Sequence, residues 1–454
     1  MLELRLIEGE AAAFRGAVRE LHAQGHRRIT LWPNNDLAVE AANHAQKLGC
    51  DVRIDAPELA ADAPGRGPAS CLLLAETDPT ALSQRLLELV DLKSGIVVAP
   101  RTRHAYDARP LFLISIPKAG THLLYSLAKA FGYHAGIICP EWPSPGHWYC
   151  IEYSNSHTRA TDFFIDTVRR SPFGNRHHPF ATSPALFIYR NPLDILVSEA
   201  NYYHRDGNAI FGGYLRNRSF EERLLALIDD PWLFGSFRNR MAGFVPWMEF
   251  ANVIPLSFEE LVGARGGGDD AVQRRLIWSL QLKLHVQGSP DAVAAQVFDT
   301  ESATFNAGQI GSHREKLGAS AMRKFIELPQ DFMRALGYAP SDGGAYNRYP
   351  ARAEEFIRRP LTTAEETFGD TPILIEAGRD GRNIVRYRGR FYAPLDEDLA
   401  ALGENELARL PSARELAELR KQLASPAFRI GTLGRRLARF VGRFARNRFS
   451  RGQS

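Results

Sequence analysis

Short apolar runs and amphipathic stretches alternate along residues 1–108. The pattern predicts helices over residues 11–23, 36–48 and 78–90, and strands over 29–32, 52–54, 71–75 and 95–99. Strands that alternate with helices are typical of a parallel α/β layer, so we expect a small Rossmann-like domain over residues 1–108. The turn from Pro33 to Asp36 lacks the glycines that let a backbone approach a pyrophosphate, so a dinucleotide site is not expected there.

A second alternating region follows a polar, irregular segment at residues 101–110. It opens with the apolar run 111–116, which is short enough for a buried parallel strand, and strands and longer helices continue to about Pro340. This pattern predicts an α/β fold with a doubly wound parallel sheet over residues 109–345.

The pattern changes again after residue 345. Three short strand-like runs, at residues 373–376, 383–387 and 390–393, are separated by turns that contain glycine, and they predict a small β-meander within residues 346–405. Ser412 and Glu415 form a capping pair at the start of a predicted helix, and a basic helical tail completes residues 406–454.

The charge is concentrated in that tail. The chain of 454 residues has a net charge of +4, yet residues 426–454 hold eight arginines and no acidic residue, so the remainder is mildly acidic. A nucleic-acid partner is therefore not expected for the main body. Apolar residues from Ile430 to Phe444 recur every three or four positions opposite the arginines, as in helices that lie on an anionic membrane surface. A helix docked on the protein, or a disordered tail that binds acidic partners, is the alternative.

Composition indicates a soluble globular protein, because 44% of the residues are hydrophobic and 24% are charged. No window approaches the roughly 18 consecutive apolar residues of a membrane span. Four cysteines follow no metal-ligand spacing and no charged-then-apolar leader opens the sequence, so we expect a cytoplasmic protein without a metal site.

The first candidate site lies where the apolar run 111–116 meets the sequence Pro117-Lys118-Ala119-Gly120-Thr121-His122. A helix that starts here directs unpaired backbone N–H groups at the loop, where an anion can bind. Gly120 permits close approach and Lys118 adds a charge. The lysine precedes the glycine, which differs from the GxxxxGK[ST] spacing of nucleotide triphosphatases and disfavours a kinase-type loop.

The second candidate site follows another apolar strand, residues 185–189. Arg190 leaves the strand, Asn191 and Pro192 suit the start of a helix, and Ser198 lies two turns into it. Doubly wound sheets bind ligands at the carboxyl ends of their strands, so Arg190 and Ser198 can reach one phosphate.

Together these motifs resemble the 5'-phosphosulfate loop and the 3'-phosphate motif of the sulfotransferase family, and the resemblance extends over residues 110–340. It implies a P-loop-like fold and the donor 3'-phosphoadenosine 5'-phosphosulfate, with no metal. Residues 253–261 and 305–314 resemble later family segments. The implied donor-binding residues are Lys118, Ala119, Gly120, Thr121, His122, Arg190, Ser198, Phe258, Gly308 and Arg314.

Two departures concern the late segment. Asn306 and Ala307 stand where the family carries two cations, so either donor affinity is reduced or Arg314 and Lys316 substitute for them.

The resemblance also implies the chemistry. Lys118 would neutralise the leaving phosphate, and His177 aligns with the catalytic histidine of the cytosolic branch, a suitable general base. Carbohydrate branches of the family use a glutamate instead. His178 and Glu152 are the alternatives to His177.

The expected function is sulfuryl transfer to a hydroxyl or amine of a carbohydrate or lipid-linked acceptor, at the inner face of the membrane. The meander resembles short modules of bacterial enzymes for surface-polysaccharide assembly, which favours such an acceptor. Two alternatives remain: a non-catalytic nucleotide- or membrane-binding module with a degenerate sulfotransferase fold, and a kinase-like P-loop enzyme.

Overall fold

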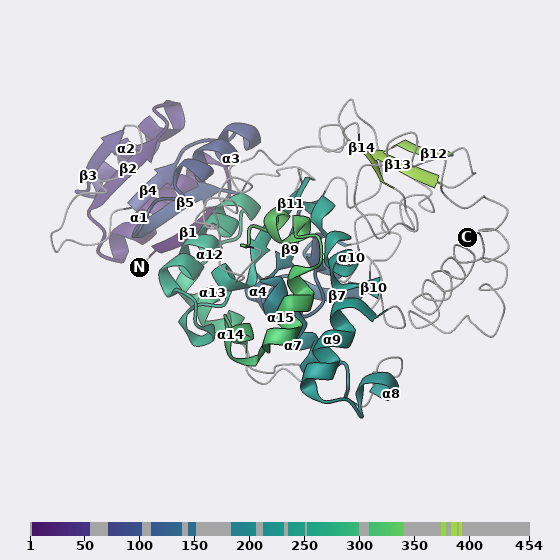
Figure 1. Cartoon of the computed structure of the whole chain (residues 1–454). Coiled ribbons are helices and arrows are strands. Elements are labelled where there is room, and N and C mark those ends of the chain that lie inside the picture. The colour runs from purple at the N-terminus through teal and green to yellow at the C-terminus, as the bar shows by residue number, and fades with distance from the viewer. Residues whose placement is uncertain are drawn as a thin grey trace.

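The computed structural model describes residues 2–54, 71–101, 110–138, 144–150, 183–205, 212–230, 235–249, 252–298 and 308–339, and three short strands between residues 374 and 392. These residues form two five-stranded sheets and one three-stranded sheet (Figure 1). Both five-stranded sheets are entirely parallel, so the predicted α/β class is confirmed.

The first sheet has the strand order β1-β5-β4-β2-β3. Its elements are β1 (Leu2–Ile7), α1 (Ala11–Ala23), β2 (Arg28–Trp32), α2 (Asp36–Lys47), β3 (Asp51–Ile54), β4 (Cys71–Leu74), α3 (Pro79–Glu88) and β5 (Gly95–Pro100). All seven elements predicted for this region are confirmed to within about two residues at either end. β1 is missing from the predicted set, although its apolar residues Leu2, Leu4 and Leu6 alternate with polar ones in the two-residue period of a strand.

The second sheet has the order β11-β9-β6-β8-β7. Its strands are β6 (Leu111–Ser115), β7 (His134–Ile138), β8 (His147–Cys150), β9 (Ala185–Tyr189) and β11 (Val253–Ser257). After β6 the chain adds β7 and β8 on one side, and later β9 and β11 on the other. The strand order therefore reverses at β6, and this is the position where open parallel sheets leave a crevice at their carboxyl edge.

Helices cover both faces of the second sheet. The helices are α4 (Thr121–Ala130), α7 (Pro192–Tyr202), α8 (Gly212–Leu215), α9 (Phe220–Asp229), α10 (Phe237–Ala242), α11 (Phe258–Leu261), α12 (Asp270–Leu284), α13 (Pro290–Val297), α14 (His313–Lys316), α15 (Ala319–Ile326) and α16 (Asp331–Ala335), with 3₁₀ turns at Val245–Glu249 and Ala264–Gly266 and a two-residue strand, β10 (Gly235–Ser236). α7, α9, α10, α15 and α16 bury one apolar cluster, and α4, α11, α12 and α13 bury the other. α4 and α7 thus lie on opposite faces of the sheet at this switch point.

The two sheets share α12. Trp278 and Leu282 of this helix are buried with Leu82 and Leu86 of α3, and the Trp278 indole N–H donates to the Leu89 carbonyl at 2.9 Å. Each such fully buried side chain contributes about 1.5–3 kcal/mol. At the edge of the first sheet, the backbone of Leu4 exchanges two hydrogen bonds, of 3.1 and 2.8 Å, with Gly288. The first sheet therefore packs tightly against the second unit.

The predicted β-meander strands are present as an antiparallel sheet of β12 (Leu374–Ala377), β13 (Asn383–Tyr387) and β14 (Arg390–Tyr392). The polar segment 102–109 and the tail 426–454 lie outside the described residues. In the part of the chain that the structure describes, no helix combines the length and apolarity that a bilayer span needs.

Candidate functional site

The loop between β6 and α4 is rigidly built. The Ser115 hydroxyl donates to the Ile116 carbonyl at 2.9 Å, and it therefore accepts the 2.8 Å hydrogen bond from the Thr121 hydroxyl. The Ala119 N–H donates to the Ile116 carbonyl at 3.0 Å. Lys118 adopts a left-handed backbone with φ of 66°, which is uncommon for a residue with a side chain. The loop thus turns tightly before the helix begins.

Packing against Phe258 requires a glycine at position 120. Its φ is 108°, and a Cβ at this position would lie 2.9 Å from Cδ2 of Phe258 and 3.2 Å from Cδ1 of Ile188. The bare side of the glycine therefore faces protein, and it lets Phe258 pack directly against the loop. This contact requires a glycine whether or not a ligand binds nearby.

Lys118 is held close to other charges. Its Nζ lies 3.6 Å from the centroid of the Tyr202 ring on α7, a cation–π geometry. The pKa of Lys118 is lowered to about 8, chiefly by burial; the Glu199 carboxylate opposes the lowering, and the cations Arg205 and Arg190 add to it. An anion that binds beside Lys118 would therefore stabilise the charged form of the lysine.

Glu199 balances this group from inside the core. Its carboxylate is paired with Arg240 at 2.6 Å, and a second Arg240 nitrogen donates to the Leu227 carbonyl at 2.9 Å. Burial raises the pKa of Glu199, while the neighbouring cations Arg240 and Lys118 act in the opposite direction. The Glu199–Arg240 ion pair therefore links α7 to the backbone of α9.

Arg190 leaves β9 at the same sheet edge, with 7% of its surface exposed. One terminal nitrogen donates to the Gln309 carbonyl at 2.6 Å and lies 3.7 Å from the Asp194 carboxylate. The guanidinium stacks 4.2 Å from the centroid of the Phe258 ring. Its Nε is buried and has no hydrogen-bond partner among the described residues. Arg190 is fixed in place while part of its donor capacity is unused.

The start of α7 is anchored to α11, the short helix that follows β11. The Asn191 side chain accepts from the Leu193 N–H at 3.0 Å, as the predicted N-cap should. The Asn191 N–H donates to Oε1 of Glu259 at 3.0 Å, and the Tyr338 hydroxyl donates to Oε2 at 2.8 Å. Burial raises the pKa of Glu259, and these hydrogen bonds oppose the rise.

The described part of the late loop lies against α7. Gly308 and Gly311 have φ of 57° and 76°, so the chain turns sharply at both. The Asp194 carboxylate accepts hydrogen bonds from Gly311, Ser312 and His313. Burial alone would raise the pKa of Asp194, but the His313 hydrogen bonds and the Arg190 charge hold it at about 2.

Most of the predicted donor-binding residues gather at one edge of the second sheet. Ala119 is fully buried, whereas His122 is exposed and Ser198 is half-buried on α7. Arg314 is exposed and folds over Gly311, its Nε 3.8 Å from where a Cβ on that glycine would lie. The predicted base His177 and its alternatives His178 and Glu152 lie outside the described residues, as do Asn306 and Ala307.

Several residues of the site were absent from the prediction. Three of them lie on α7, the helix that follows Arg190: Asp194, Glu199 and Tyr202. Asp194 is four residues from Arg190, a separation of about one helical turn. Gln309 and His313 are more than a hundred residues away in sequence, and no local pattern links them to Arg190.

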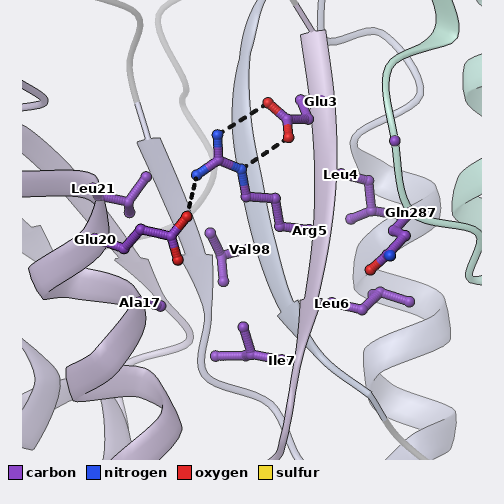
Figure 2. A pocket seen from close by; sticks show the side chains of 11 residues that line it. Glu3, Leu4, Arg5, Leu6, Ile7, Ala17, Glu20, Leu21, Val98 and Gln287 are labelled. Atoms are coloured by element: carbon purple, nitrogen blue, oxygen red, sulfur yellow. Dashed lines mark hydrogen bonds and ion pairs between the residues drawn. The ribbon is translucent and has the colours of Figure 1, made fainter. Parts of the chain in front are cut away.

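A separate hollow of about 430 Å³ lies beside β1 (Figure 2). Its cation, Arg5, points between two carboxylates, with its Nε 2.9 Å from Glu3 and a terminal nitrogen 3.5 Å from Glu20. The charge of this arginine is thus already matched by carboxylates within the hollow.

Fold and site together define an α/β protein with two cationic loops at the switch point of a parallel sheet. No protein-family model matches the chain, and no curated protein matches it. Among solved structures the chain is similar to mouse sulfotransferase SULT7A1, in a crystal structure of its complex with PAP. The two are 17% identical, the match covers 55% of this chain and 89% of the mouse chain, and the TM-score is 0.36.

Proposed function

We propose that the chain is a sulfotransferase that transfers a sulfuryl group from 3'-phosphoadenosine 5'-phosphosulfate to a hydroxyl or amine of a carbohydrate or lipid-linked acceptor. One observation carries the proposal. The Lys118 loop and Arg190 follow adjacent parallel strands, β6 and β9, and both contact the same side chain, Phe258. Two anion-binding groups on one edge suit a nucleotide with phosphates at both ends of its ribose.

The residues fit such a donor. The backbone at the start of α4 and the Lys118 ammonium would hold the 5'-phosphosulfate, because an anion there would stabilise the charged form of Lys118, which burial disfavours. Arg190 and Ser198 would hold the 3'-phosphate, because a guanidinium can bond phosphate oxygens in pairs and Arg190 follows the strand next to the one that precedes the Lys118 loop.

The reaction would be an in-line displacement at sulfur. The bond between sulfur and the phosphate oxygen breaks as the acceptor oxygen or nitrogen bonds to sulfur, and the acceptor proton passes to a base. Lys118 would neutralise the charge that develops on the leaving phosphate. His177 is the proposed base, with Glu152 and His178 as alternatives.

A kinase-like reaction has less support from this loop. Magnesium in nucleotide triphosphatases is held by a serine or threonine directly after the loop lysine, and here that position is the buried Ala119. The nearby Thr121 hydroxyl is engaged with Ser115.

The C-terminal segments support the proposed acceptor class. The basic, amphipathic sequence 426–454 suits an anionic membrane surface, where each arginine would add roughly 1 kcal/mol, and it would bring the protein to lipid-linked acceptors. Removal of residues 426–454 should release the protein from vesicles that contain anionic lipid. Persistent binding would contradict this part of the proposal.

Calorimetry with 3',5'-adenosine bisphosphate and with ATP tests the donor assignment. The bisphosphate should bind more tightly than ATP, and Arg190→Ala should weaken it by about 10- to 100-fold, the range expected for lost charge-assisted hydrogen bonds. Arg85→Ala is the matched control, since Arg85 also stacks on an aromatic ring, that of Trp32, but in the first sheet. Tighter binding of ATP, or no loss in Arg190→Ala, would refute the assignment.

A further inference from the structure

The Asp194 carboxylate is the point where α7 and the late loop meet. Its Oδ1 accepts hydrogen bonds from the His313 N–H at 2.9 Å, from Nδ1 of the His313 ring at 2.8 Å and from the Ser312 hydroxyl at 3.1 Å. Its Oδ2 accepts from the Gly311 N–H at 2.8 Å and lies 3.7 Å from a terminal nitrogen of Arg190. One buried carboxylate therefore binds three consecutive loop residues and the arginine.

The two carboxylate oxygens have different tasks. Oδ1 holds the loop through His313 and Ser312, and Oδ2 faces Gly311 and Arg190. The same loop returns to the arginine, because the Gln309 carbonyl accepts from Arg190 at 2.6 Å. Arg190, Asp194 and the loop thus form a closed ring of contacts, and displacement of the loop would free the guanidinium to turn.

His313 is the side chain that completes this ring. The His313 side chain is 2% exposed. Its imidazole and its backbone N–H both donate to Oδ1 of Asp194, which fixes the orientation of the carboxylate. The geometry requires that Nδ1 carries a hydrogen, because Asp194 is ionised and can only accept. Oriented carboxylate–histidine pairs position other groups without themselves touching the ligand.

We propose that Asp194 and His313 are positioning residues that lock the loop 308–316 against Arg190 and so give the site its preference for a nucleotide with a 3'-phosphate. This inference rests on the proposed function, since it assigns the 3'-phosphate to Arg190. His313 acts through Asp194, and Asp194 acts through the guanidinium. The preference depends on the orientation of Arg190, whereas binding at the Lys118 loop does not.

The test compares the affinities of 3',5'-adenosine bisphosphate and adenosine 5'-monophosphate, which differ only in the 3'-phosphate. The ratio of the two affinities is measured by calorimetry for wild type, His313→Phe and His313→Asn. His313→Phe keeps a ring of similar size but removes the donor, and the ratio should fall by about tenfold, the effect of a lost hydrogen bond to a charged group. The 5'-monophosphate affinity should stay unchanged.

His313→Asn is the conservative variant, because its amide can still donate a hydrogen bond near the position of Nδ1, and it should restore most of the ratio. His22→Phe makes the same substitution on α1 of the first sheet and should leave the ratio as in wild type. If His313→Phe does not fold, Asp194→Asn carries the same test, since it keeps the volume of the side chain while removing its charge.

The outcomes separate this inference from the proposed function. A wild-type protein without preference for the bisphosphate would overturn the assignment of Arg190, and the inference with it. A wild type with the preference, together with a His313→Phe variant that retains it, would overturn the inference alone. Equal losses for both ligands would also overturn it, because they would show a general structural role.

Discussion

The strand order reverses at a switch point in both parallel sheets, the position where open sheets leave a crevice, but different residues lie there. In the first sheet the order reverses between β2 and β4, and the Asn35 side chain donates across this point to the Ala75 carbonyl at 2.6 Å. The nearby Arg85 is paired with Glu76 at 3.1 Å. In the second sheet the crevice between β6 and β9 presents Lys118 and Arg190, and Arg190 retains a buried donor without a partner among the described residues.

The comparison indicates that the sheet topology provides a position where a ligand can bind, and that the side chains of the loops determine whether one does. A side-chain hydrogen bond closes the first crevice and an ion pair neutralises its cation. The second crevice concentrates positive charge that only partly finds counter-charges. We therefore expect anion binding at the second sheet, and a structural role for the corresponding loops of the first.

The largest effect should come from Lys118→Ala. Loss of the charge that stabilises the leaving phosphate should lower turnover by about 100-fold or more, as for other groups that stabilise developing charge. Sulfuryl transfer from labelled donor measures it. Lys47→Ala, an exposed lysine at the end of α2 in the first sheet, is the control and should retain full turnover. Equal turnover in the two variants would remove the distinction between the sheets.

Substitution of Gly120 separates backbone conformation from packing. Gly120 and Gly49 both have positive φ, but nothing lies within 4 Å of a Cβ on Gly49, whereas Phe258 would clash with one on Gly120. Gly49→Ala should cost about 1–2 kcal/mol of stability for the left-handed backbone alone. Gly120→Ala should cost a further 1–3 kcal/mol or so from overpacking and should also weaken donor binding. Chemical denaturation and calorimetry measure both, and identical losses at the two glycines would argue against the Phe258 contact.

The pH dependence of donor affinity should identify Lys118. Burial lowers the pKa of Lys118 to about 8, so the ammonium is charged below this pH and loses its proton as pH rises through it. Affinity for the anionic donor should then fall, by up to about tenfold per pH unit. Lys118→Arg should remove the fall, because a guanidinium stays charged. A wild-type affinity that is flat from pH 7 to 9 would contradict the assigned role.

Asn35→Ala should have the smallest effect on the proposed activity. The variant loses the cap of α2 and the hydrogen bond across the first crevice, which should cost about 1 kcal/mol of stability. Donor affinity should be unchanged. A change in donor affinity would mean that the first crevice communicates with the second.

Sequence patterns predicted the elements better than their contacts. The strands before Lys118 and Arg190 were predictable because apolar runs of five or six residues end at a proline or a capping residue. Edge strand β1 was missed although it alternates, and the three meander strands were found from equally short runs.

The candidate site was predictable only where its residues are local. The loop at Lys118 and the helix start at Arg190 can be identified from neighbouring residues. The packing of Phe258 against Gly120 depends on a contact between the loop before α4 and the start of α11, which are far apart in the sequence. The hydrogen bonds between Asp194 and His313 join residues 119 positions apart, and only the fold brings them together.

The central claim is that one nucleotide bridges the Lys118 loop and Arg190. A crystal structure with bound 3',5'-adenosine bisphosphate tests it most directly. The account predicts the 5'-phosphate at the backbone N–H groups of Gly120 and Thr121 and the 3'-phosphate at Arg190 and Ser198. A nucleotide bound elsewhere, or one whose 3'-phosphate points away from Arg190, would contradict it.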